Sequence, residues 1–256
     1  MGILSTRLHR SQEAQIKRVV CLGTLTLAGV LALASANEAR QARSPLVLTE
    51  VAENLYMLGN DPAGEGMRGG GNTAIFVGSS GVTLVDTKIF GYGQDILAKV
   101  RETTDKPIVR IINTHTHYDH SGGNVEFADT VDFVVHENTL AQMSRATCEP
   151  VTNCSAFKGD NAKYLPKTTF SDRTSLGSGA DQIDLYYFGR GDTFVVFRNA
   201  RTVQTGDMFA RKGLPFLDVP NGNGSALEFG ETLKKAVVSS TGQCNRAAAS
   251  LSAGVA

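Results

Sequence analysis

Short apolar runs and stretches of helical spacing alternate along most of the chain. A short apolar run bounded by turn residues predicts a buried strand, and apolar positions three and four residues apart predict a helix. Strands are predicted at 51–58, 73–77, 81–86, 108–112, 131–135, 183–188 and 202–205. Helices are predicted at 91–104, 137–146 and 225–238. No internal repeat or interior linker interrupts this series.

The N-terminal 36 residues have the layout of a secretory signal. Residues 1–18 are polar and basic, and residues 19–36 are uncharged, mostly apolar, and end in Ala34-Ser35-Ala36. A basic region, an apolar region and a small-residue cleavage site are together typical of a signal peptide. We therefore predict a signal peptide at 1–36, a polar spacer at 37–46 and a periplasmic or secreted protein. The apolar run is also barely long enough to cross a bilayer, so an uncleaved membrane anchor is the alternative.

Charge and length restrict what the rest of the chain does. Without residues 1–36 the chain keeps 21 basic and 24 acidic residues, a net charge of about −3. A mildly acidic surface without a Lys/Arg cluster has no electrostatic reason to bind nucleic acid. The remaining length, roughly 220 residues, is enough for one domain with a substantial core. We expect a small-molecule substrate, no nucleic acid, and membrane contact only if the apolar segment stays uncleaved.

Three histidines and one aspartate follow the predicted strand 108–112 within six positions. They are His115, His117, Asp119 and His120. Side chains two residues apart on an extended backbone share a face, so His115 and His117 are placed to hold one ion. Imidazole nitrogens and carboxylate oxygens are common ligands of Zn²⁺. Asp119 and His120 follow where the chain turns, and we expect them to face a second point beside the first.

This H-x-H-x-D-H segment resembles the motif of the metallo-β-lactamase superfamily. The likeness extends from about Val51 to about Leu233 and includes Gly81–Asp86 and Thr205–Asp207. The resemblance implies an α/β fold, an αββα sandwich that we place at 47–240, and one or two zinc ions. It also implies that Asp207 is a carboxylate shared by both ions, although a Gly-Asp pair after a strand is also a common turn.

The resemblance further implies hydrolysis of an ester, thioester, lactone, amide or phosphodiester. Zinc lowers the pKa of its bound water to about 7, so the predicted mechanism is attack by a metal-bound hydroxide. Asp119 is the predicted catalytic residue, because it would orient that hydroxide or accept its proton. The motif is specific for the superfamily and does not name the substrate.

The chain departs from the family pattern in two places. Relatives carry a G-x-H-T-x-G-D segment whose histidine binds the first ion, and this chain has Gly189-Arg190-Gly191-Asp192 there. The family also uses a histidine near its C-terminal end, and none follows His136 here. We therefore predict that at most one ion is well bound. The alternative function is a degenerate or truncated family member that binds a small molecule or a partner without catalysis.

The C-terminal residues 241–256 form an Ala/Ser-rich tail without the apolar run of a final strand. We predict that this tail is unstructured and that the second half of the sandwich is incomplete.

Four further features each have two interpretations. Asp86 either caps a strand end or orients a metal-bound histidine. His136, at a strand-to-helix junction, is predicted to be structural and not a ligand. The glycine-rich loop 59–71 either overhangs the metal site, as in the family, or is a solvated connector. Cys148 and Cys154 either close a small disulfide loop in an exported protein or remain reduced.

Overall fold

The computed structural model of the protein describes residues 43–64, 69–148, 152–209, 217–219, 224–240 and 246–248, together with Thr26. Apart from Thr26, the predicted signal peptide lies outside the described residues, as do most of the predicted spacer and Cys244. No helix in the described part of the chain is both long enough and apolar enough to cross a membrane.

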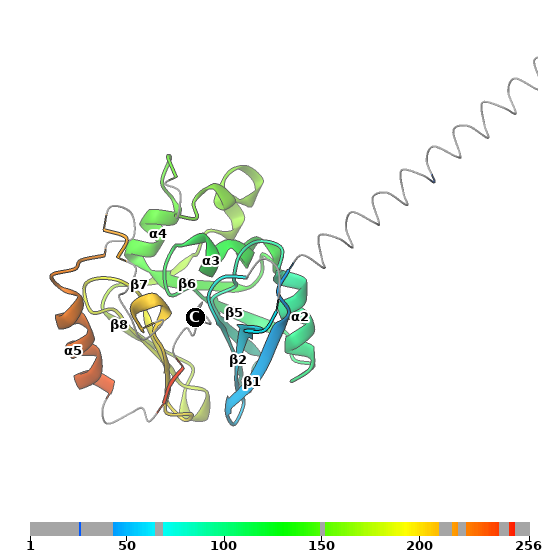
Figure 1. Cartoon of the computed structure of the whole chain (residues 1–256), viewed down its shortest axis with the longest axis horizontal. Coiled ribbons are helices and arrows are strands. Elements are labelled where there is room, and N and C mark those ends of the chain that lie inside the picture. The colour runs from blue at the N-terminus through cyan, green and yellow to red at the C-terminus, as the bar shows by residue number, and fades with distance from the viewer. Residues whose placement is uncertain are drawn as a thin grey trace, which may run out of the picture. The chain divides into compact units, whose positions relative to one another are not determined.

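The first half of the chain forms a seven-stranded sheet whose strands lie in chain order (Figure 1). They are β1 (Leu46–Ala52), β2 (Leu55–Asn60), β3 (Thr73–Val77), β4 (Val82–Val85), β5 (Ile108–Ile112), β6 (Asp132–His136) and β7 (Thr168–Phe170). Strands β1 to β4 pair antiparallel, and β4 to β7 pair parallel. Parallel neighbours end at the same edge of a sheet, so the segments that follow β4 and β5 emerge side by side.

The second half forms a five-stranded sheet in the order β12, β11, β10, β9, β8. Its strands are β8 (Arg173–Leu176), β9 (Ile183–Tyr186), β10 (Phe194–Phe197), β11 (Thr202–Gln204) and β12 (Arg246–Ala248). Strands β8 to β11 pair antiparallel, and β12 pairs parallel to β11. In the β10–β11 hairpin, the residues just before β10 therefore lie opposite the residues just after β11.

The two sheets share an apolar core that includes Val85 and Ile112 from the first sheet and Leu185 and Val195 from the second. Helix α2 (Gly93–Arg101) covers the other face of the first sheet, where Ile96 and Val100 pack on its strands. Helix α5 (Phe229–Ser240) packs on the other face of the second sheet (Figure 1). The layer order confirms the predicted αββα sandwich. Its second half, predicted to be incomplete, has both a sheet and a covering helix among the described residues.

The remaining helical segments among the described residues follow or connect strands of the two sheets. They are α3 (Tyr118–Ser121), α4 (Glu137–Met143) and five 3-10 turns, Gly122–Glu126, Ser155–Phe157, Gly159–Tyr164, Gly179–Asp181 and Gly206–Phe209. Helix α3 holds part of the histidine motif. The turn Gly206–Phe209 holds Asp207. Helix α3 follows the end of β5, and this turn follows the end of β11.

Several predicted elements have the predicted positions, and others need correction. Strands β3 and β5 have the predicted bounds. Residues 51–58 were predicted as one strand but contain the end of β1 and most of β2, because Asn54 turns the chain at a φ of 60°. Strands β7, β8 and β10 were not predicted. These strands are only three or four residues long, too short for the periodicity of apolar and polar residues to be recognised.

The predicted unstructured tail contains strand β12. Residues 246–248 pair with Thr202, Val203 and Gln204 of β11. An edge strand pairs through backbone N–H and C=O groups, which every residue except proline provides. An apolar run is therefore not required, and its absence from the tail was a poor guide.

Candidate metal centre

The ends of β4, β5 and β11 deliver the side chains of one polar cluster. His115 and His117 follow β5, and His117 is the residue before helix α3, which contains Asp119 and His120. Asp207 follows β11 in the turn Gly206–Phe209. The structure thus brings together all five residues that the sequence predicted as metal ligands.

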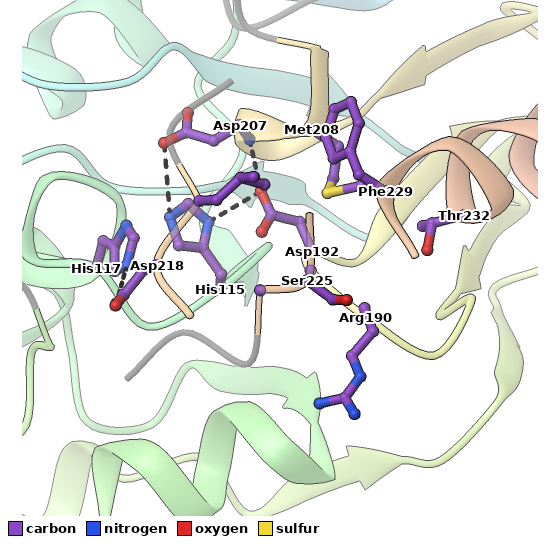
Figure 2. Close-up of a pocket in the computed structure, with 13 residues that line it drawn as sticks. His115, His117, Arg190, Asp192, Asp207, Met208, Asp218, Ser225, Phe229 and Thr232 are labelled. Carbon is purple, nitrogen blue, oxygen red and sulfur yellow. Dashed lines mark hydrogen bonds and ion pairs between the residues drawn. The ribbon is translucent and has the colours of Figure 1, made fainter. Parts of the chain in front are cut away.

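His115, His117 and Asp207 form the tightest group of possible ligands. One ligand atom from each lies within 4.8 Å of the other two. Nε2 of His115 is 3.9 Å from Oδ2 of Asp207 (Figure 2). Both histidines are buried, and a little over a quarter of the Asp207 side chain is exposed. Two imidazoles and one carboxylate are an ordinary protein ligand set for catalytic zinc.

His120 and Asp119 extend this group on the other side of Asp207. Nε2 of His120 lies 3.3 Å from Oδ1 of Asp207 and 3.8 Å from Oδ2 of Asp119. The rings of His115 and His120 are 4.2 Å apart between centroids. The Asp207 carboxylate therefore faces both histidines, with Oδ2 towards His115 and Oδ1 towards His120.

Asp86 orients His120 from the end of β4. Its Oδ2 accepts a hydrogen bond from Nδ1 of His120 at 2.8 Å, and its two oxygens also accept from the backbone and hydroxyl of Thr114, both at 2.8 Å. Burial alone would lower the pKa of His120, but Asp207 and Asp86 outweigh it and hold this pKa well above its ordinary value. Of the two interpretations of Asp86, its geometry favours the orienting role.

The other two histidines are held neutral. Burial lowers the pKa of His115, and the neighbouring His120 lowers it further. Burial likewise lowers the pKa of His117, with a contribution from His115. Neutral imidazole is the form that binds a metal, so these shifts suit the proposed ligands.

Asp192 is a member of the cluster that the sequence did not predict. The β10–β11 register pairs Val195 with Gln204, and its continuation places Asp192 opposite Asp207. Oδ2 of Asp192 accepts the backbone N–H of Asp207 at 2.5 Å and lies 3.3 Å from Nδ1 of His115. Burial raises the pKa of Asp192 to about 7, and the charge of Asp207 contributes. The segment that lacks the expected histidine thus contributes a buried carboxylate to the cluster.

Asp218 is the second unpredicted member. Its Oδ2 lies 3.0 Å from Nε2 of His117, and the residue is buried (Figure 2). Prediction of β10 would have revealed a hairpin with β11 and so placed Asp192 opposite Asp207, but β10 is too short to be predicted. Nothing in the sequence around Asp218 points to His117, which lies 101 positions earlier.

The end of the glycine-rich loop packs against the cluster. The N–H of Gly71 donates to the carbonyl of Asp119 at 3.1 Å, and a Cβ on Gly71 would lie only 2.7 Å from Nε2 of His120. Nζ of Lys88, which is fully buried, donates to the carbonyl of Gly71 at 2.7 Å. Residues 69–71 thus support the site, while 65–68 lie outside the described residues.

His136 has the structural role that the sequence predicted. Its Nδ1 accepts the backbone N–H of Asn138 at 3.1 Å and so caps helix α4. Its ring stacks on Tyr187 with centroids 3.6 Å apart, and its Nε2 bonds to the carbonyl of Ser171. Both ring nitrogens are therefore used in packing the first sheet.

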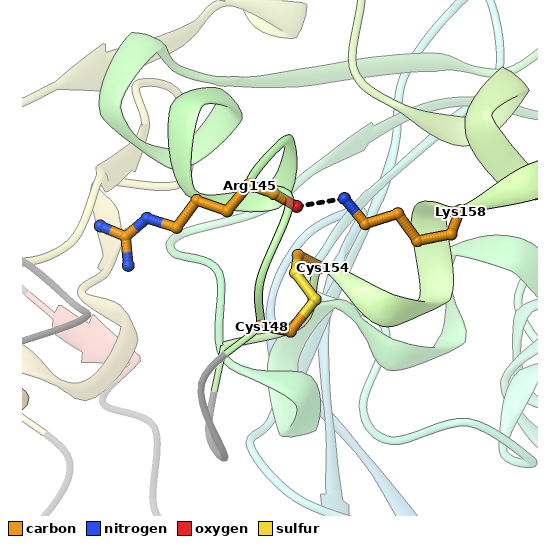
Figure 3. Close-up of a disulfide and its surroundings, with 4 residues drawn as sticks. All are labelled: Arg145, Cys148, Cys154 and Lys158. Atoms are coloured by element: carbon orange, nitrogen blue, oxygen red, sulfur yellow. Dashed lines mark hydrogen bonds between the residues drawn. A yellow bond between two sulfur atoms is a disulfide. The ribbon is translucent and has the colours of Figure 1, made fainter.

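Of the two interpretations of Cys148 and Cys154, the structure shows the disulfide (Figure 3). Nζ of Lys158 donates to the carbonyl of Arg145 beside it. The C-terminal end of the disulfide loop pairs with the histidine motif. Thr152 forms an antiparallel bridge with His117, and the N–H of Asn153 donates to the carbonyl of Thr116 at 2.9 Å.

A pocket opens beside the cluster, on the side of His115 and His117 (Figure 2). Its volume is about 480 Å³, including space open to solvent. Asp192, Asp207 and Asp218 line its polar side, and Met208, Leu217 and Phe229 are among its apolar lining residues. Apolar walls with a few polar groups among them are typical of small-molecule sites.

The residues present fit a metal ion. Nε2 of His115 and Nε2 of His120 are buried without a hydrogen-bond partner among the described residues. An unsatisfied buried polar atom normally costs roughly 1–3 kcal/mol, and a bound cation would satisfy both atoms. Both nitrogens face the carboxylate of Asp207, so the cluster presents nitrogen and oxygen donors towards one place.

Comparison with known proteins agrees with this fold. The family model of the Metallo-beta-lactamase superfamily matches residues 66–251. The crystal structure of DIM-1 metallo-β-lactamase exposed to ceftazidime aligns with a TM-score of 0.60 at 15% identity, over 80% of this chain and 89% of that chain. A metallo-β-lactamase from Pontibacter korlensis aligns with a TM-score of 0.58 at 17% identity, over 77% of this chain and 86% of that chain.

The crystal structure of metallo-β-lactamase IND-7 aligns with a TM-score of 0.59 at 15% identity, over 78% of this chain and 88% of that chain. No curated protein matches the chain. At such low identity these structures show a shared fold and leave the substrate open. The family model covers well over half of the sequence, and the chain belongs to the metallo-β-lactamase superfamily.

Proposed function

We propose that this protein is a zinc-dependent hydrolase that cleaves an ester, thioester, lactone or amide bond in a small molecule. The observation that carries the proposal is the buried group of His115, His117 and Asp207, whose ligand atoms lie within 4.8 Å of one another. Membership of the superfamily agrees with a metallo-hydrolase, and the pocket beside the group gives a substrate access to it.

His115, His117 and Asp207 would hold one zinc ion, and His120 and Asp119 would add donors from the far side of Asp207. When bound, zinc would activate a water and polarise the bond to be cleaved. Only one ion is expected to bind well, because a second would depend on Asp119, His120 and a share of Asp207. Three protein ligands and a water are an ordinary set for one catalytic zinc.

Asp119 is the proposed proton acceptor. About a third of its side chain is exposed, whereas His120 beside it is almost fully buried. Its carboxylate is therefore accessible to a water molecule and can accept the proton that this water loses on attack. The apolar side chains of Met208 and Phe229 in the pocket would hold the uncharged part of the substrate.

A second candidate function follows from the missing histidines. The sequence has no histidine after His136, so two nitrogen ligands that the family uses are not available. Loss of a residue that supports a ligand weakens metal affinity roughly 10 to 100-fold. Loss of a ligand itself should weaken it by at least as much. The second candidate is therefore a family member that binds a small molecule or a partner without catalysis.

Metal analysis and a substrate panel test these two functions. The purified full-length chain is assayed for bound zinc and for hydrolysis of aryl esters, thioesters, lactones and β-lactams, beside the double variant His115→Ala/His117→Ala. About one zinc per chain, with turnover that a chelator removes and added zinc restores, supports the hydrolase. Zinc binding without turnover on any class contradicts the hydrolase, and a wild-type chain without zinc supports the non-catalytic member.

We also propose that the protein is periplasmic or secreted and does not bind nucleic acid. The disulfide between Cys148 and Cys154 supports an oxidising compartment, since disulfides are rare in the cytosol. Fractionation of cells that express the full chain tests the location. Recovery in the cytosol with both cysteines reduced would contradict it.

A further inference from the structure

Each of the three clustered histidines has a carboxylate close to one of its ring nitrogens. The pairs are His120 Nδ1 with Asp86 at 2.8 Å, His117 Nε2 with Asp218 at 3.0 Å and His115 Nδ1 with Asp192 at 3.3 Å. All three carboxylates belong to buried residues. A buried carboxylate on one imidazole nitrogen is the usual way in which proteins fix the ring that binds a metal through its other nitrogen.

The proton positions on His115 follow from its neighbours. The hydroxyl of Thr114 donates to Asp86 at 2.8 Å, so its oxygen accepts from Nδ1 of His115 at 3.0 Å. The proton of neutral His115 is therefore on Nδ1, next to Asp192. The lone pair is on Nε2, which is buried, has no hydrogen-bond partner among the described residues and faces Asp207.

Asp192 acts on two of the candidate ligands at once. Its Oδ2 binds the backbone N–H of Asp207 and lies beside Nδ1 of His115. Gly206 makes room for it, because a Cβ at Gly206 would overlap the Asp192 carboxylate and lie 2.9 Å from Oγ1 of Thr114. Oδ2 of Asp192 thus contacts the backbone of Asp207 and Nδ1 of His115. It does not contact Nε2 of His115, the atom that would bind the metal.

Asp218 does the same for His117 from a different part of the chain. It lies in the segment before helix α5, and its carboxylate reaches Nε2 of His117 across the pocket wall. Its hydrogen bond favours a proton on Nε2, so the ring would present Nδ1 to a metal. Both histidines of the H-x-H pair are then oriented by acids outside the motif.

We propose that Asp192 and Asp218 are positioning residues that orient His115, His117 and Asp207 for a single metal ion. The inference rests on the proposed metal site but adds two residues that the histidine motif does not contain. It also explains how a chain without the histidines that its relatives use after this motif would keep a ligand group of defined geometry. The ion class is a divalent transition metal, because the donors are imidazole and carboxylate.

The test measures metal binding by the full-length chain and does not depend on turnover. Zn²⁺ affinity is measured by competition with a chromophoric chelator, and Co²⁺ is added separately to record its absorption spectrum, which reports the ligand geometry. The variants are Asp192→Asn and Asp218→Asn. Asn keeps the side-chain size and one oxygen acceptor but removes the charge. The control is Asp184→Asn, a buried carboxylate of β9 that binds Ser175 and Arg198 away from the pocket.

We expect each of the two variants to bind Zn²⁺ about 10 to 100-fold more weakly than wild type, with a changed Co²⁺ spectrum. The control should keep both properties, even if it unfolds at a lower temperature. Wild-type affinity and spectrum in a folded Asp192→Asn or Asp218→Asn chain would overturn the inference while leaving the metal site intact. A wild-type chain that binds neither ion would instead overturn the proposed function. If Asp192→Asn does not fold, Asp218→Asn decides the question.

Discussion

Oδ2 of Asp86 lies 2.8 Å from Nδ1 of His120, although the two residues are 34 positions apart in the sequence. Asp86 has a φ of 63°, in the left-handed region that aspartate enters more readily than most residues. In this conformation the carboxylate turns back from the end of β4 and also accepts both hydrogen bonds from Thr114. One side chain therefore fixes a candidate ligand and the start of the motif that contains it.

We predict that Asp86→Asn weakens zinc binding and destabilises the fold. Asparagine has one oxygen acceptor in place of two, so part of the group of hydrogen bonds that Thr114 and His120 donate to Asp86 is lost. Zinc affinity should fall about 10 to 100-fold, and the free energy of unfolding by about 1–3 kcal/mol for the unsatisfied buried donors. Chelator competition and denaturant unfolding measure the two effects. Asp181→Asn, which removes an exposed carboxylate bound to Ser79, is the control. Wild-type affinity in Asp86→Asn would contradict the orienting role.

The sequence predicted the part of the site that is local in the chain. His115, His117, Asp119 and His120 lie within six positions after one strand, so the direction of that strand is enough to place them together. Asp207 was placed by resemblance to the family, and the structure brings it next to His115 and His120. The layers of the fold were predicted from the same resemblance, and the short apolar runs predicted the positions of several strands.

The remaining site residues depend on contacts between distant segments. Asp192 reaches His115 only because β10 and β11 form a hairpin with one particular register, and β10 is a four-residue strand that was not predicted. Asp218 reaches His117 through a segment without regular structure. Lys88 is fully buried and donates to the carbonyl of Gly71, and no periodicity or motif in the sequence indicates this contact.

We predict that Lys88 makes stability rise with pH. Burial lowers the pKa of Lys88 from 10.5 to about 7, although Asp119 and Asp86 oppose this shift. Between these two values the unfolded chain holds a proton that the folded chain has lost. Stability therefore increases with pH, by about 1.4 kcal/mol per pH unit for one proton.

The variant Lys88→Met tests this dependence. Denaturant unfolding of the metal-free protein at several pH values between 7.5 and 9.5 should give a smaller slope of stability against pH in the variant than in wild type. Lys99→Met, which removes a lysine of α2 that pairs with Glu102, should keep the wild-type slope. Equal slopes in wild type and Lys88→Met would mean that Lys88 keeps its proton when the protein folds.

We predict that Gly71→Ala disturbs His120. An alanine Cβ at this position would lie 2.7 Å from Nε2 of His120, closer than side chains approach one another, and Asp86 holds the ring from the other side. Overpacking of this kind costs about 1–3 kcal/mol of stability. The ring that carries a candidate ligand nitrogen would be displaced, so zinc affinity should fall as well. The two losses are measured by denaturant unfolding and by chelator competition.

The matched control is Gly230→Ala. A Cβ there meets no atom within 4 Å, and the residue lies in helix α5. Alanine is a better helix former than glycine, so this variant should be as stable as wild type or more stable, by up to about 1 kcal/mol. Gly71→Ala with wild-type zinc affinity would mean that the loop moves away from His120 and that its contact does not position the ring.

The last prediction concerns the disulfide between Cys148 and Cys154, which closes the loop next to the histidine motif. Because Thr152 pairs with His117 and Asn153 with Thr116, loosening this loop should loosen the motif backbone. The double variant Cys148→Ser/Cys154→Ser should lose about 2 kcal/mol of stability, as expected for a short closed loop. It should also bind zinc more weakly than wild type, whereas Cys244→Ser should bind zinc as wild type does. A double variant that is less stable but binds zinc with wild-type affinity would show that the loop supports the fold and not the site.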